Sequence, residues 1–236
     1  MAFSTGRSEL HEEIEDQFFA LKRMVEEVPE LIRKSFQETS HYIQKEAQKI
    51  GDGDKEVEFS TYSTLYNLYG MDGESIMLDN TYKAIAIVIF STYEMSVSTV
   101  AQQLAKCKIS KMLKGSESMY YIDCIQRNYH FTLKHQSDIQ EVNNKYKEFR
   151  NLITHGLHEI RYLCDVQIQD NLDNLKKRID LIQGTSGIVF TQETMRIESP
   201  AYLLETIEKM RNILVELILK LEKTLLLPSQ KIQNYD

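Results

Sequence analysis

The chain has 236 residues, of which 42% are apolar, and this is enough for one sizeable hydrophobic core. Its nine glycines and three prolines exclude a collagen-like or low-complexity chain and argue against a turn-rich β-sandwich. The net charge of −7 argues against broad, unspecific binding of nucleic acid.

The sequence carries no clear sign of secretion, membrane insertion or metal binding. Three widely spaced cysteines without a C-x-x-C pair are typical of reduced thiols and do not indicate a zinc knuckle. The longest apolar run, residues 84–90, is much shorter than a membrane span, and the N-terminal residues contain no apolar signal-peptide core. We therefore expect a cytoplasmic protein with no membrane association, no metal and no cofactor.

Helical periodicity begins close to the N-terminus. Apolar residues recur at three- and four-residue steps over residues 8–28, which predicts an amphipathic helix. Pro29 either begins a second helix or kinks a continuous one that runs to about residue 50. Residues 51–56 are predicted to form a turn, and a short helix is predicted around residues 63–68.

The middle of the chain contains its most apolar stretch. Residues 80–106 are predicted to form a helix that is apolar on every side, as is typical of a central buried helix. We expect further helices over residues 116–135, 139–155 and 165–182, with a loop at residues 136–138.

The last part of the chain alternates in the manner of strands before it becomes helical again. Residues 188–197 predict a small β-hairpin, and Ser199-Pro200 suits the start of a last helix that ends near residue 226. The leucine-rich stripe of that helix is either a core stripe or a helix-pairing seam. We predict an all-α fold with this one hairpin, in a single domain over residues 1–236.

One helical face of residues 146–161 is strongly polar. At 100° per residue, six polar side chains fall within a sector of about 140°; they are Arg150, Asn151, Thr154, His155, His158 and Arg161. Asn151 and His155 are four residues apart, so the amide can orient the imidazole. Gly156 lets a backbone or a phosphate approach closely.

These groups suit RNA cleavage without a metal ion. An imidazole with a pKa near 6.5 can accept the 2′-OH proton or protonate the departing 5′-oxygen. A guanidinium can stabilise the negative charge that builds up on the phosphate oxygens. One histidine and one arginine make an incomplete acid–base pair, which a second copy of the chain would complete.

Arg150-Asn151-x-x-x-His155-Gly156 resembles the R-N-x-x-x-H motif of HEPN-domain ribonucleases, all-α proteins of toxin–antitoxin and antiviral defence systems. The resemblance covers about residues 80–160 and includes Ser91-x-x-Glu94 on the apolar helix. It implies a HEPN-like helical bundle with a core at about residues 80–226 and an N-terminal helical extension. It also implies a homodimer with a composite active site, and metal-independent cleavage that leaves a 2′,3′-cyclic phosphate.

Glu94 gives a separate physical argument for the same site. It lies on a helical stripe with Ile87, Phe90, Val97 and Ala101. A carboxylate on an apolar stripe needs a partner, because an isolated buried charge costs several kcal/mol. We expect that partner to be Arg150 or His155, and we expect Glu94 to orient the site.

The supporting residues each have two interpretations. His158 and Arg161 either contact RNA or lie on a solvated surface. Tyr146, one turn before Arg150, either borders the site or packs in the core. Lys111 and Lys114 either gather RNA phosphates or belong to a solvated helix end.

Two functions follow from this sequence. The first is an endoribonuclease in which His155 is the general acid or base, Arg150 stabilises the transition state and Asn151 orients the imidazole. Its expected partners are RNA, such as a tRNA loop, a second copy of the chain, and an antitoxin or regulator. The alternative is a non-catalytic helical binding or assembly module, in which Arg150 simply forms an ion pair with Glu148 or Glu94.

Overall fold

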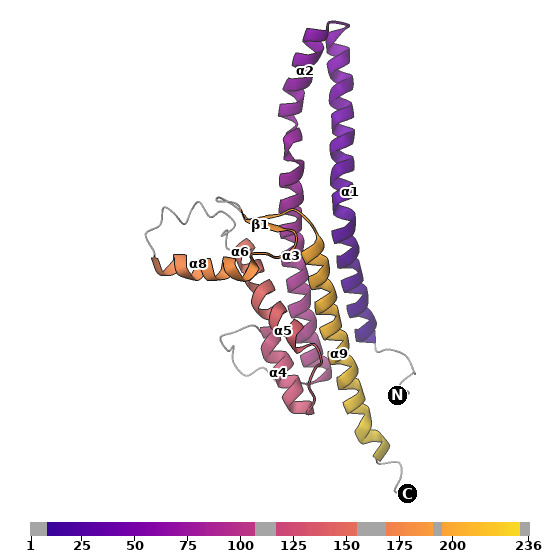
Figure 1. Cartoon of the computed structure of the whole chain (residues 1–236). Coiled ribbons are helices and arrows are strands. Elements are labelled where there is room, and N and C mark those ends of the chain that lie inside the picture. The colour runs from indigo at the N-terminus through magenta and orange to yellow at the C-terminus, as the bar shows by residue number, and fades with distance from the viewer. Residues whose placement is uncertain (1–8, 107–116, 155–168, 191–194, 232–236) are drawn as a thin grey trace.

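The computed structural model describes residues 9–106, 117–154, 169–190 and 195–231, and these residues are mostly helical. A two-helix arm projects from one end of a helical bundle (Figure 1). The elements are α1 (Glu9–Gly51), α2 (Lys55–Leu68), η1 (Met71–Gly73), α3 (Glu74–Thr99), η2 (Val100–Leu104), α4 (Glu117–Tyr129), α5 (Gln136–Glu141), η3 (Val142–Tyr146), α6 (Lys147–Thr154), α8 (Gln169–Ile182), β1 (Ile188–Phe190), β2 (Met195–Ile197) and α9 (Ala201–Lys231). The predicted all-α character and the hairpin before the last helix are confirmed.

Helix α1 is continuous, with Pro29 inside it. Its N-terminal half buries the predicted apolar stripe against the bundle, namely Ile14, Phe18, Leu21 and Val25. Val28 is the last α1 residue that packs against this core, so Pro29 lies where the helix leaves the bundle and enters the arm. The absent amide N–H of Pro29 leaves the carbonyl of Val25, four residues earlier, without its helical donor.

The arm turns at Gly51 and continues into α2. Gly51 is buried, and a Cβ there would lie 2.9 Å from the Cβ of Glu58, so the two helices approach closely at the tip. The Asp54 carboxylate then accepts hydrogen bonds from the N–H groups of Glu56 and Val57 and caps α2. The helix predicted at residues 63–68 therefore begins earlier, at Lys55.

Helix α3 is the central helix of the bundle, as predicted. Ile85, Ala86, Ile89, Phe90 and Val97 are buried, and α3 packs against α1, α4, α6 and α9. It begins at Glu74, which is before the predicted start at residue 80, because its first turns belong to the arm.

Two predicted boundaries in the middle of the chain are wrong. Helix α4 ends at Tyr129 because His130 adopts a left-handed conformation with φ of 54°, and the helix does not reach residue 135. The expected loop at residues 136–138 is instead the first turn of α5. The helix that follows also contains a π-helical stretch, η3, between α5 and α6.

The hairpin pairs Ile188 with Ile197 and is held to α3 by a hydrogen bond to Asp79, which also forms an ion pair with Lys83 within α3. One oxygen of Asp79 accepts the N–H of Ile197 at 2.7 Å, and the other accepts the ammonium of Lys83 at 2.7 Å. Both charged side chains are largely buried. Asp79 therefore connects the start of α3 to the second strand.

Helix α9 forms the last layer of the bundle. Its leucine-rich stripe is buried throughout and is therefore a core stripe, formed by Leu203, Ile207, Met210, Leu214, Leu217 and Leu221. The Ser199 hydroxyl accepts the N–H of Ala201, as expected of a capping residue.

A carboxylate on α9 also anchors the connection between α4 and α5. Glu216 accepts the N–H groups of Lys134 and His135 and pairs with Lys220 at 3.1 Å. Partial burial raises the pKa of Glu216, but the hydrogen bond from Lys134 and the charge of Lys220 outweigh it, so the net pKa is lowered.

One helical segment among the described residues, Met71–Leu104, is long and apolar enough to cross a membrane, and half of its most apolar window is buried inside the protein. The central helix of a soluble bundle has the same length and composition. The length of this segment alone therefore assigns no location to the chain.

We expect Asp79→Ala to lower the free energy of unfolding by about 3 kcal/mol, because it leaves Lys83 and the N–H of Ile197 buried without their acceptor. Urea unfolding measures this loss. The matched control is Asp16→Ala at an exposed position of α1, with a change of about 0.5 kcal/mol or less. A loss at residue 79 no larger than that of the control would show that the ion pair is dispensable.

Glu216→Gln tests the anchored connection through its pH dependence. A lowered pKa means that the charged carboxylate stabilises the fold above its ordinary unfolded pKa, and this stabilisation is lost as the pH falls through the folded pKa. We expect the variant to be less stable by about 1 kcal/mol at pH 7 and closer to the wild type near pH 3. Equal destabilisation at both pH values would contradict a charge effect.

Candidate active site

Helix α6 presents the start of the Arg-Asn-x-x-x-His motif on the flank of the bundle. Phe149 and Leu152 face the core and are completely buried, which fixes how the helix is rotated. The neighbouring positions 150 and 151 are therefore half-buried at the edge of the helix contact. A guanidinium at this position is held firmly and still reaches solvent.

Arg150 and Glu94 form an ion pair between α6 and α3. The Nη1 of Arg150 lies 3.5 Å from Oε2 of Glu94, and the two side chains are 25% and 29% exposed. The Cζ of Arg150 lies 4.5 Å from the ring centroid of Phe90, so the guanidinium also stacks on an aromatic face. The structure thus pairs Glu94 with Arg150, one of the two partners that we expect from the sequence.

Asn151 is the third member of this arrangement. Its Oδ1 accepts a hydrogen bond from Nη2 of Arg150 at 3.2 Å. The Nε of Arg150 is buried and has no hydrogen-bond partner among the described residues. The guanidinium is therefore fixed by one carboxylate, one amide and one ring.

The neighbouring polar residues have other partners. Glu148, the other expected partner of Arg150, forms an ion pair with Arg178 at 3.1 Å and so connects α6 to α8. The hydroxyl of Thr154 donates to the carbonyl of Arg150 within the same helix.

Tyr146 lies beneath the site and does not border it. Its ring packs against Phe90, Phe149 and Tyr202 with centroids 5.6 to 5.9 Å apart, and its hydroxyl donates to the carbonyl of Ala86 at 3.2 Å. Burial raises the pKa of this phenol well above its usual value. Tyr146 can support Arg150 from below, but it cannot touch a substrate.

The remaining predicted site residues lie outside the described part of the chain. They are His155, Gly156, His158, Arg161, Lys111 and Lys114. Their expected roles stay predictions, and the same is true of the orienting contact between Asn151 and His155. In the described ranges, no group of three or more histidine, cysteine, aspartate or glutamate side chains is arranged to hold a metal ion.

Beside the ion pair, α3 exposes a stripe that sequence reasoning missed. Ala84, Val88, Ser91 and Met95 follow each other at four- and three-residue steps and are all exposed. Met95 is 65% exposed and directly follows Glu94. The sequence signal was weak because the whole helix is apolar, so its solvent-facing side could not be told from its core sides. The stripe offers a contact surface at the edge of the site.

The comparisons with known proteins do not assign this chain to a group. No protein-family model matches it, and no curated protein and no solved structure shows a significant similarity. The site therefore has to be interpreted from its own geometry.

A double-mutant cycle of Glu94→Gln and Arg150→Gln tests whether the ion pair is energetically coupled. We expect a coupling of about 0.5–1 kcal/mol in urea unfolding, because both groups are partly buried and the guanidinium is held in place. The exposed pair Arg23 and Glu27 in α1 is the control, with a coupling of about 0.3 kcal/mol. Additive effects at residues 94 and 150 would mean that the two charges act independently.

Proposed function

We propose that the chain is a metal-independent endoribonuclease of the HEPN type that cleaves RNA through attack of a 2′-OH. One observation carries this function: the arginine and asparagine of an Arg-Asn-x-x-x-His motif lie together at a bundle edge, and the arginine is held by a carboxylate from the central helix. A fixed, partly exposed guanidinium is what stabilisation of a phosphorane requires.

The chemistry needs one base, one acid and one positive charge. The 2′-oxygen attacks phosphorus as His155 accepts its proton, and the P–O5′ bond breaks as an imidazolium protonates the leaving oxygen. The products are a 2′,3′-cyclic phosphate and a free 5′-OH. Arg150 stabilises the charge on the non-bridging oxygens, while Glu94 and Asn151 keep it in position.

We propose further that two chains share one site. A single chain supplies one motif histidine, and the second imidazole would come from a second copy. The exposed stripe around Val88 and Met95 lies beside Glu94 and is where that copy would contact α3. Arg161, Lys111 and Lys114 would contact RNA phosphates, in a substrate such as a tRNA loop, and an antitoxin or regulator would control the activity in a defence role.

The alternative function, a non-catalytic binding or assembly module, is supported by a different feature of the same residues. The charge of Arg150 is already balanced by Glu94, and its guanidinium already stacks on Phe90. An arginine satisfied in this way also serves as a purely structural link between α3 and α6. The two functions differ in what the histidine does, so the histidine is the residue to change.

The test incubates the purified protein with total RNA in EDTA and reads the fragments and their ends. We expect wild-type cleavage with 2′,3′-cyclic phosphate ends, and a loss of about 100-fold or more in His155→Ala, because general acid–base catalysis contributes about 10²–10⁴. His41→Ala, at an exposed position of α1, is the matched control and should keep full activity.

Equal RNA cleavage by the His155→Ala variant would rule out the catalytic role. Absence of cleavage by a folded, dimeric wild type would favour the assembly module. Loss of stability in Arg150→Ala without any activity to lose would point the same way.

A further inference from the structure

The arm, defined as residues 29–77 of α1, α2, η1 and the start of α3, is poorly packed. Its buried residues are only Ile43, Ala47 and Gly51. None of these belongs to the main hydrophobic core of the bundle. Figure 1 shows why: over most of this length two helices face each other and no third element covers them.

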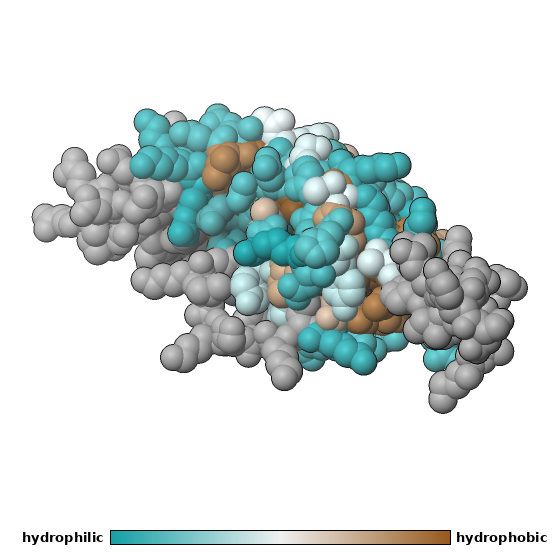
Figure 2. Space-filling model, turned by 90° about the horizontal axis from the view of Figure 1, so that it is seen from below, coloured by the Kyte–Doolittle hydropathy of each residue, from teal (hydrophilic) through white to brown (hydrophobic). Residues whose placement is uncertain are grey.

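The arm is also rich in exposed apolar side chains. Of the sixteen large apolar side chains exposed in the described residues, nine lie in the arm: Leu31, Tyr42, Ile50, Val57, Phe59, Leu68, Tyr69, Ile76 and Met77. On the face seen from the opposite end, the described residues are mostly hydrophilic, with smaller hydrophobic areas between them (Figure 2). Single exposed apolar residues are ordinary, but such a concentration on one element marks an interaction surface.

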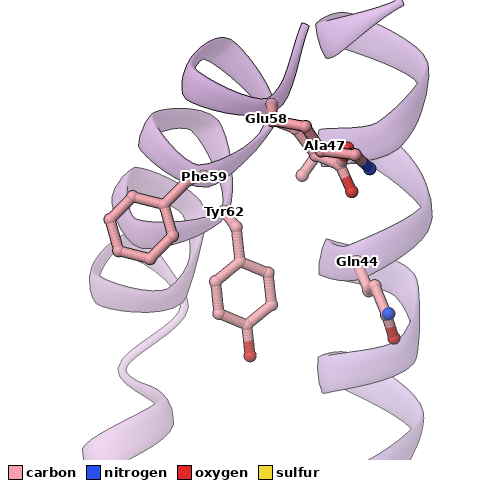
Figure 3. A pocket seen from close by; sticks show the side chains of 6 residues that line it. Gln44, Ala47, Glu58, Phe59 and Tyr62 are labelled. Carbon is pink, nitrogen blue, oxygen red and sulfur yellow. The ribbon is translucent and has the colours of Figure 1, made fainter. Parts of the chain in front are cut away.

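A cleft of about 430 Å³ opens between α1 and α2 near the tip of the arm. Gln44 and Ala47 line it from α1, and Phe59 and Tyr62 line it from α2. Figure 3 shows the Tyr62 ring pointing between the two helices and the Phe59 ring on the outer side of α2. Phe59 is 75% exposed, and Tyr66 continues the aromatic edge with its ring centroid 5.8 Å from that of Tyr62.

The surroundings of this cleft carry an excess of negative charge. The two helices around it, residues 44–62, contain five acidic and three basic residues, a net charge of −2. Two of the basic residues are paired with acidic ones, Lys55 with Glu58 at 2.8 Å and Lys49 with Glu46 at 3.9 Å. Exposed Asp52 and Glu56 lie next to the cleft in sequence and add negative charge at the tip.

We propose that the Phe59–Tyr62 cleft is a docking site for a basic amphipathic helix of another protein. Apolar side chains of that helix would fill the cleft, and its lysines or arginines would meet the carboxylates next to the cleft and the faces of the exposed rings. The stretch from Phe59 to Tyr66 spans about two helical turns, which fits a short helical segment. This site does not depend on the proposed ribonuclease activity.

A second copy of the chain is a poorer occupant of this cleft than a basic helix. A two-fold contact would place the same patch against itself, so the exposed Asp52 and Glu56 of both copies would face each other. Like charges opposed across an interface cost several kcal/mol. Nucleic acid is disfavoured by the same negative charge.

The experiment measures binding of two labelled 18-residue peptides to the full chain by fluorescence anisotropy. The first peptide has leucines at three- and four-residue steps and lysines on the opposite helical face, and the second replaces every lysine by glutamate. We expect the lysine peptide to bind in the micromolar range and more weakly at higher salt, and the glutamate peptide not to bind.

The variants distinguish peptide binding at the cleft from non-specific binding elsewhere on the surface. Phe59→Ser and Glu56→Lys should each weaken binding of the lysine peptide, about tenfold for Phe59→Ser. Phe19→Ser is the matched control, because Phe19 is 62% exposed but lies in the bundle half of α1; it should change binding less than twofold.

Equal binding of both peptides, equal losses in Phe59→Ser and Phe19→Ser, or no binding by the folded wild type would overturn the proposal. Sedimentation of the same variants tests whether a second copy of the chain occupies the cleft instead. A wild-type dimer that Phe59→Ser converts to a monomer would show that a second copy fills the cleft, and the basic partner would be wrong.

Discussion

The aromatic contact between α3, α6 and α9 is the packing on which the rest of the structure depends. Tyr146 lies in its centre, between Phe90 of α3 and Tyr202 of α9, with Phe149 of α6 beside it. Buried rings of this size dominate the packing energy of a core and allow few arrangements. The rotation of α6 and its height on α3 follow from this contact, and so does the meeting of Arg150 with Glu94.

The elements whose hydrophobic periodicity is strong could be predicted from the sequence. The apolar helix, the hairpin and the stripe of the last helix each have a clear periodicity, and each is present. The partner of Glu94 could be predicted from energetics, because burying a carboxylate on an apolar stripe is costly unless a cation lies next to it. The burial of Tyr146 was only one of two alternatives, because a tyrosine one turn before Arg150 can border the polar sector or pack in the core.

The features that were missed depend on tertiary contacts or single backbone conformations. The left-handed His130 ends α4 without a glycine, and the π-helical stretch η3 has no composition of its own. Helix α2 is rich in serine, threonine and tyrosine, which are weak helix formers, and it forms over its full length because Asp54 caps it and α1 packs against it. The exposed side of α3 could not be identified because every side of that helix is apolar.

The bundle and the arm differ in how their polar and apolar side chains are used. In the bundle, α3 packs against α1, α4, α6 and α9, and its charged side chains are paired, Asp79 with Lys83 and Glu94 with Arg150. In the arm, the helices that leave the bundle have almost no buried residue and carry excess negative charge. A free two-helix hairpin with so little core is stabilised weakly by its own contacts, because helical stability in proteins comes mainly from packing of an apolar face. The arm therefore gains most from a partner, and its charge selects which partner that can be.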